Sequence, residues 1–155
     1  MPGYDISLEI TLDNPAIDAA ALPILAERIM TGEDVPPGTA LAILVTGDDE
    51  IREMNRRFLG IDEPTDVLSF PDEAGDFVQG IADEPLLGDI AIALPTAARQ
   101  AEEVGHSLDA ELAHLLVHGI LHLCGYDHVD SPEDEARMRR REEHYLGDLG
   151  TVHAH

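Results

Sequence analysis

The sequence predicts an α+β domain in which a small mixed sheet of about four strands packs against helices, with a central buried helix carrying an HxxxH histidine pair. Three observations support this fold class. Segments with strand character and segments with helical periodicity follow one another along the chain. Within the expected helix 107–123, residues 112–123 are apolar nearly all round, which is typical of a buried helix. With 155 residues, 44% of them hydrophobic, the chain can fill one core.

The first half of the chain alternates strands with helices. Residues 4–12 alternate apolar and polar side chains, as a half-buried strand does. Residues 17–30 have helical periodicity and are followed by Thr31-Gly32. The continuous apolar run at 40–46 predicts a buried strand. Asp48 is expected to cap the next helix, which should end near residue 58.

The second half of the chain is expected to contain two strands and then three helices. In order, these segments are 64–71, 88–94, 95–104, 107–123 and 131–146. The first of them is flanked by prolines, so it should lie at a sheet edge or border a groove. Ser107 is the expected cap of the buried helix. The complete order is therefore β-α-β-α-β-β-α-α-α.

Residues 1–146 are expected to form a single domain, with residues 147–155 as a frayed tail. The acidic, non-apolar start of the chain does not resemble a signal peptide. No apolar stretch approaches the roughly 20 residues that a membrane span needs. A soluble, cytoplasmic protein without membrane contact is the expectation.

The net charge of −23 opposes binding to phosphate backbones at long range. All nine basic residues are arginines, however, and they are unevenly distributed. Because guanidinium groups suit phosphate, Arg56 and Arg57 are candidate substrate-binding residues. The alternative is that such arginines pair with carboxylates on their own helix, Glu53 among them.

The histidines provide the strongest functional signal. His118 and His122 are four residues apart on the expected helix, so both rings lie on one face. Gly125 permits a sharp turn that would return His128 to the same point. Three imidazoles can hold one divalent metal per chain and leave a coordination position open for catalysis. Because Cys124 is the only cysteine, a thiolate site is disfavoured and an internal disulfide is impossible.

Three further residues are weak candidates for proton transfer: His114, Glu111 and Asp127. His114 lies one turn before His118 and could equally be a polar group at the wetter end of the helix. Asp127 could orient an imidazole or a water, or could be an ordinary turn residue. The sequence does not decide between these alternatives.

The histidine spacing also matches zinc proteases of the metzincin type, which carry a glutamate directly after the first histidine as the base. Here that position is Gly119, so peptide hydrolysis by that route lacks its base. The spacing nevertheless leaves a metalloprotease-like hydrolase as an alternative function. A non-catalytic factor with a structural metal is another alternative, although such sites usually have four protein ligands.

The string from His118 to His128 resembles the signature of the YbeY family, bacterial endoribonucleases that act in rRNA maturation. Two further blocks are similar to the family in the same order, namely Asn55 followed by 62–71, and 87–90. The resemblance implies an α+β sandwich with a cleft beside a zinc-type metal on His118, His122 and His128. It also implies single-stranded RNA as substrate, a role in rRNA processing and ribosome quality control, a link to the ribosome, and a cytoplasmic location.

One position departs from the family pattern. Many members carry an arginine just before the glycine that follows Asn55, and here that position is Leu59, before Gly60. An arginine there could clamp a phosphate in the cleft. Arg56 or Arg57 could compensate only if its side chain faces the same groove.

Overall fold

The computed structural model describes residues 4–12, 17–71, 86–126 and 132–146. Four strands form one sheet in the order β1-β2-β4-β3. They are β1 (Asp5–Ile10), β2 (Ala40–Thr46), β3 (Val67–Pro71) and β4 (Leu86–Ala93). Strands β1, β2 and β4 are parallel neighbours, and β3 runs antiparallel to β4. The prediction of a mixed four-stranded sheet is confirmed, and the proline-flanked β3 is an edge strand as expected.

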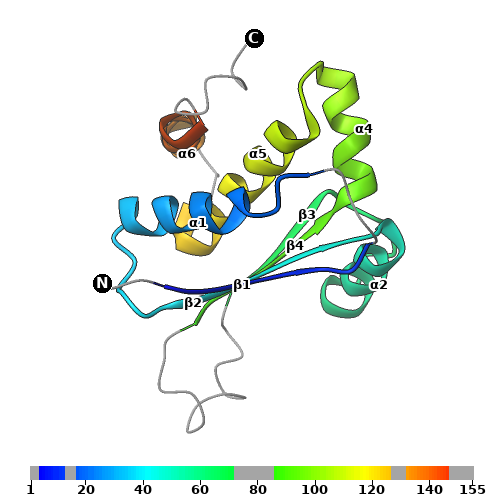
Figure 1. Ribbon diagram of the computed structural model, residues 1–155, viewed down its shortest axis with the longest axis horizontal. Helices are drawn as coiled ribbons and strands as arrows, with labels where there is room; N and C mark the ends of the chain where they lie inside the picture. Colours follow the sequence, from blue (N-terminus) through cyan, green and yellow to red (C-terminus); the bar gives the residue numbers. More distant parts are fainter. Residues whose placement is uncertain (1–3, 13–16, 72–85, 127–131, 147–155) are drawn as a thin grey trace, which may run out of the picture.

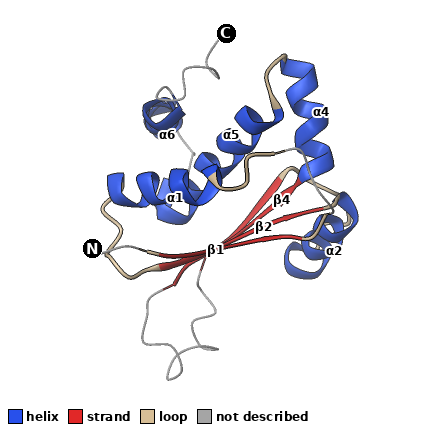
Figure 2. Cartoon of the chain, in the orientation of Figure 1, coloured by secondary structure: helices blue, strands red, loops and turns tan. Residues whose placement is uncertain are grey.

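Helices cover both faces of this sheet. They are α1 (Ala21–Gly32), α2 (Asp48–Leu59), α4 (Leu94–Val104), α5 (Leu108–Leu121) and α6 (Pro132–Leu146). Figure 1 shows α1, α5 and α6 on one side and α2 on the other, and Figure 2 shows the same layers by element type. The α+β prediction is therefore confirmed. Among the described residues, no helix combines the length and apolar character needed to span a membrane.

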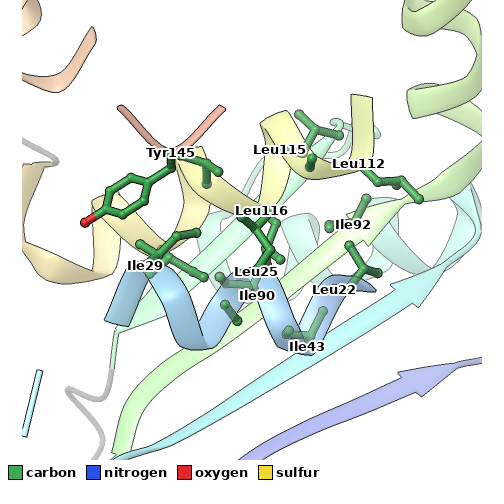
Figure 3. Close-up of a cluster of buried hydrophobic side chains, with 14 of the residues drawn as sticks. Leu22, Leu25, Ile29, Ile43, Ile90, Ile92, Leu112, Leu115, Leu116 and Tyr145 are labelled. Carbon is green, nitrogen blue, oxygen red and sulfur yellow. The ribbon is translucent and has the colours of Figure 1, made fainter. Parts of the chain in front are cut away.

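The larger core lies between the sheet and α1, α5 and α6. Strand alternation supplies one side of it, because Ile43 and Ile90 point toward the helices (Figure 3). Leu116 of α5 and Ile29 of α1 are fully buried there. Intervening strand residues such as Ala91 face the smaller cluster under α2. Helix α5 is thus the central buried helix that the sequence predicted.

Several predicted boundaries were wrong by a few residues. Helix α1 begins at Ala21 rather than at 17, and β4 ends where Leu94 opens α4. Gly47 caps α2, while Asp48 is its first residue and instead accepts a hydrogen bond from Thr96 on α4. Propensity signals locate such elements but seldom their ends, because tertiary contacts decide where a helix starts.

The Ser107 cap is confirmed, since its side chain accepts a hydrogen bond from the Ala110 backbone nitrogen at 3.1 Å. The end of the same helix differs from the prediction. Helix α5 ends at Leu121 and continues as a π-helical turn, η1 (His122–Tyr126), so Gly125 does not stop it. Ser131 and the expected tail at 147–155 lie outside the described residues, and the single-domain assignment of 1–146 stays a prediction.

Candidate metal centre

Helix α5 and the first residue of η1 present three histidines along one stripe, His114, His118 and His122, and each of them is partly exposed. The rings of His114 and His118 are nearly parallel, with centroids 6.5 Å apart. The rings of His118 and His122 are closer, with centroids 4.5 Å apart. The i, i+4 spacing predicted this common face.

The Nε2 atoms of His118 and His122 lie 3.0 Å apart, so the two imidazoles present the same ring nitrogen to one point. His122 is the first residue of η1, and π-helical turns often occur at functional sites because they re-aim side chains. The arrangement can bring two neutral imidazole lone pairs to one cation.

Glu142 of α6 contacts the other nitrogen of His118. Its Oε2 lies 2.8 Å from His118 Nδ1, and the two side chains are 18% and 38% exposed. A carboxylate accepts hydrogen bonds and does not donate them, so it favours the tautomer with the proton on Nδ1. In that tautomer Nε2 carries the lone pair that a metal needs. No local sequence pattern indicated this contact, because Glu142 lies 24 residues further along the chain.

The described donors fit a zinc-type metal but do not complete its ligand set. No group of three or more His, Cys, Asp or Glu side chains among residues 4–12, 17–71, 86–126 and 132–146 could hold one ion. His128, the expected third ligand, lies outside those residues, as does Asp127. Imidazole nitrogen is a preferred zinc ligand. Burial, with the nearby Glu33 carboxylate, raises the pKa of the Cys124 thiol to about 11, which disfavours a thiolate ligand.

A pocket of about 410 Å³ opens beside the histidines, between α5 and the edge strand β3. Its lining combines the three histidines with a carboxylate, a hydroxyl and apolar side chains: Leu59, Asp66, Val67, Leu68, Ser69, His114, Leu115, His118 and His122. The proline-flanked strand borders this groove, as the sequence suggested. Neither Asp66 nor Ser69 was singled out as a site residue, although both lie in the block that resembles the family.

Asp66 is the carboxylate in the pocket lining, and polar groups hold it in place. Thr65 Oγ1 lies 3.4 Å from its Oδ1. With the Gln100 amide turned to donate, the amide nitrogen lies 3.3 Å from Asp66 Oδ2 and 2.8 Å from Glu111 Oε2. One amide therefore bridges two carboxylates.

Glu111 does not belong to the pocket lining. It is 7% exposed, and its Oε1 lies 2.6 Å from His106 Nε2. His106 contacts one carboxylate oxygen of Glu111, and the Gln100 amide contacts the other. Glu111 therefore helps to position Asp66 through the Gln100 amide, which contacts both carboxylates. His114, in contrast, faces the pocket, so of the weak proton-transfer candidates it has the better placed side chain.

Gly119 faces the sheet and not the pocket. A Cβ there would lie 3.1 Å from Ser69 Oγ and 3.2 Å from Ile90 Cδ1. The absent side chain allows α5 to pack closely against β3 and β4. A glutamate at this position would collide with the core, which argues against a metzincin-type base.

The two candidate substrate arginines differ in their partners. Arg56 Nη2 lies 2.5 Å from Glu53 Oε2, and this hydrogen bond with its charge attraction raises the pKa of Arg56. Arg57 instead lies over the Phe58 ring, 5.4 Å from its centroid. Leu59, at the family's arginine position, lines the pocket and is 56% exposed. Arg57 does not line the pocket, but it is not paired with Glu53 as Arg56 is, so Arg57 is the more available of the two cations.

Comparison with known proteins identifies relatives over most of the chain. The family described as "Endoribonuclease YbeY" matches residues 9–150. A protein named Endoribonuclease YbeY from Chloroflexus aggregans is 46% identical over 93% of this chain and 96% of its own length. Its namesake from Chloroflexus aurantiacus is 48% identical over 91% and 90%. The solution structure of TM1509 from Thermotoga maritima aligns with a TM-score of 0.61 and 27% identity, covering 94% of this chain and 92% of that one.

Proposed function

This chain belongs to the YbeY endoribonuclease family, and on that premise we propose that it is a metal-dependent endoribonuclease that cleaves single-stranded RNA. The observation that carries the proposal is the pocket whose lining combines the convergent His118 and His122 nitrogens with His114 and Asp66. In this proposal the substrate is rRNA, and the setting is rRNA maturation and ribosome quality control in the cytoplasm.

We propose one divalent metal per chain, with zinc as the expected ion, held by His118, His122 and His128. Such an ion supplies Lewis acidity toward a phosphodiester and acidifies water at neutral pH. The imidazole pair and Glu142 support this assignment, since nitrogen donors with an outer carboxylate are typical of zinc sites.

The remaining pocket residues have roles that follow from their chemistry. Asp66 is suited to accept a proton, and His114 to accept or donate one, at opposite walls of the same pocket. Leu59 gives the rim an apolar surface against which a nucleobase can pack. Arg57, two residues before the pocket-lining Leu59 on α2, supplies a positive charge that a phosphate would need on a very acidic protein.

A single comparison tests the proposal. The protein, purified without a His tag, is compared with His118→Ala and with His144→Ala, which removes an exposed histidine of α6 as a control. We expect about one metal per chain and cleavage of single-stranded RNA in the wild type and the control, with both lost in His118→Ala.

Each other outcome is informative. If the wild type binds metal but does not cleave RNA, the non-catalytic factor with a structural metal would be favoured over the nuclease. Cleavage that survives complete removal of metal would overturn the metal assignment. Product ends bearing a 2′,3′-cyclic phosphate would identify the ribose 2′-hydroxyl as the attacking group, whereas 5′-phosphate and 3′-hydroxyl ends would indicate water.

A further inference from the structure

Helix α6 is fastened to α1 by a buried polar cluster. Arg141 donates to Glu33 Oε2 through Nε at 2.9 Å and Nη2 at 2.6 Å. The Tyr145 hydroxyl donates to the same oxygen at 2.5 Å. Tyr145 is 2% exposed and Glu33's side chain 7%. Three charge-assisted hydrogen bonds on one carboxylate oxygen leave α6 little freedom to slide or rotate.

The packing of Tyr145 on α1 requires a glycine. A Cβ on Gly32 would overlap the Tyr145 hydroxyl oxygen, so any other residue would displace that ring. The last residues of α6, with Met138 two turns earlier, also belong to the main core. Both the polar and the apolar contacts therefore fix where α6 lies across α5.

Glu142 immediately follows Arg141, so the docking of α6 also sets the position of its carboxylate. That carboxylate lies 2.8 Å from His118 Nδ1 and is mostly screened from water. The neighbouring Glu143 is exposed. Two adjacent glutamates on one helix therefore occupy different environments, and one of them meets the histidine.

We infer that Glu142 is the positioning residue of the metal centre: it holds the His118 ring and keeps the proton on Nδ1, so that Nε2 faces His122 with its lone pair available. This inference rests on the proposed metal site. It also means that α6, from outside the histidine motif, determines how well that motif binds metal. Outer-shell carboxylates of this kind typically change metal affinity by about 10–100-fold.

The test compares Glu142→Ala and Glu142→Gln with Glu143→Gln, which removes a charge at the adjacent exposed position. Zinc affinity is measured by competition with a chromophoric chelator. We expect a loss of about 10–100-fold for Glu142→Ala. Glu142→Gln should lose less, because its amide oxygen still accepts from Nδ1–H without the charge. Glu143→Gln should bind as the wild type does.

A second readout needs no metal. Nitrogen NMR of the histidine rings in metal-free protein reports the His118 tautomer, which we expect to be Nδ1–H in the wild type and Glu143→Gln but mixed in Glu142→Ala. Unfolding midpoints of the metal-free variants show whether each one still folds. If Glu142→Ala does not fold, the comparison of Glu142→Gln with the wild type is the test.

The outcomes separate the two proposals. Zinc affinity of Glu142→Ala within twofold of the wild type, or an Nε2–H tautomer in the wild type, would overturn the role of Glu142. Failure of the wild type to bind zinc would instead overturn the metal site, while the tautomer measurement would still decide what Glu142 does to His118.

Discussion

Two stripes along helix α5 differ in surroundings although they share the same 14 residues of helix. Leu112, Leu116 and Ile120 are 1%, 0% and 0% exposed and pack against α1 and the sheet. His114 and His118 face the pocket on another side of the helix. The apolar stripe fixes the helix in the core, whereas the histidine stripe carries no comparable packing. Stability and chemistry should therefore be separable by mutation on one helix.

The largest expected effect is that of His122→Ala. Loss of one convergent imidazole should reduce bound metal from about one per chain toward zero and RNA cleavage to background. The unfolding midpoint of the metal-free protein should be unchanged, because this side chain is only partly buried. Elemental analysis, an RNA cleavage assay and thermal unfolding in chelator measure the three quantities. A variant that retained metal and cleavage would remove His122 from the site.

Leu116→Ala should have the opposite profile. Its fully buried side chain leaves a cavity, so the free energy of unfolding should fall by about 2–5 kcal/mol. Below its melting temperature the variant should still bind about one metal per chain. Urea unfolding and metal analysis at low temperature check both statements. Loss of metal from the folded variant would show that the two stripes are coupled.

Gly119→Ala tests the boundary between the stripes. The added Cβ would contact Ser69 and Ile90 at 3.1–3.2 Å, while alanine improves the intrinsic helix propensity by about 1 kcal/mol. We expect the crowding to prevail, with a net destabilisation of about 1 kcal/mol. Chemical denaturation measures this change. A clearly stabilised variant would mean that α5 can shift away from the sheet at no cost, contrary to the close packing inferred here.

Arg57→Ala tests the proposed phosphate contact of α2, away from both stripes. Arg57 lies over Phe58, whereas Arg56 pairs with Glu53. Removing a cation that contacts phosphate should lower the slope of log affinity against log salt by about one. Arg56→Ala is the matched control and should change the slope less. RNA binding titrations over a range of salt concentrations compare them, and equal slopes for the wild type and Arg57→Ala would exclude this contact.

The smallest effect is expected at an exposed ion pair on α2. Arg52 lies 2.7 Å from Asp62, and its hydrogen bond lowers the pKa of that carboxyl. A carboxyl with a depressed pKa stabilises the fold above its unfolded pKa of 3.8 and loses that contribution as the pH falls through the folded value. Solvent screens this pair, so Arg52→Ala should leave unfolding unchanged within error. A carboxyl NMR titration should show the Asp62 midpoint rising toward 3.8, and an unmoved midpoint would contradict the pairing.

Local sequence was sufficient for much of the architecture. Alternating or continuous apolar runs, flanking prolines and helical periodicity located the four strands and the helices, and the Ser107 cap marked the start of α5. The i, i+4 spacing placed His118 and His122 on one face, because helical geometry is set within a few residues. The same signals missed helix ends such as Ala21, where neighbouring elements decide the boundary.

The surroundings of the histidines depended on segments far apart in the sequence. Glu142 meets His118 only because Arg141 and Tyr145 dock α6 on α1. Asp66 faces the pocket only because β3 pairs with β4 at the sheet edge beside α5. The sequence by itself determined which residue types were available and which local face they share. Tertiary structure decided which of them meet, because side-chain contacts between distant segments follow from packing, which no local periodicity encodes.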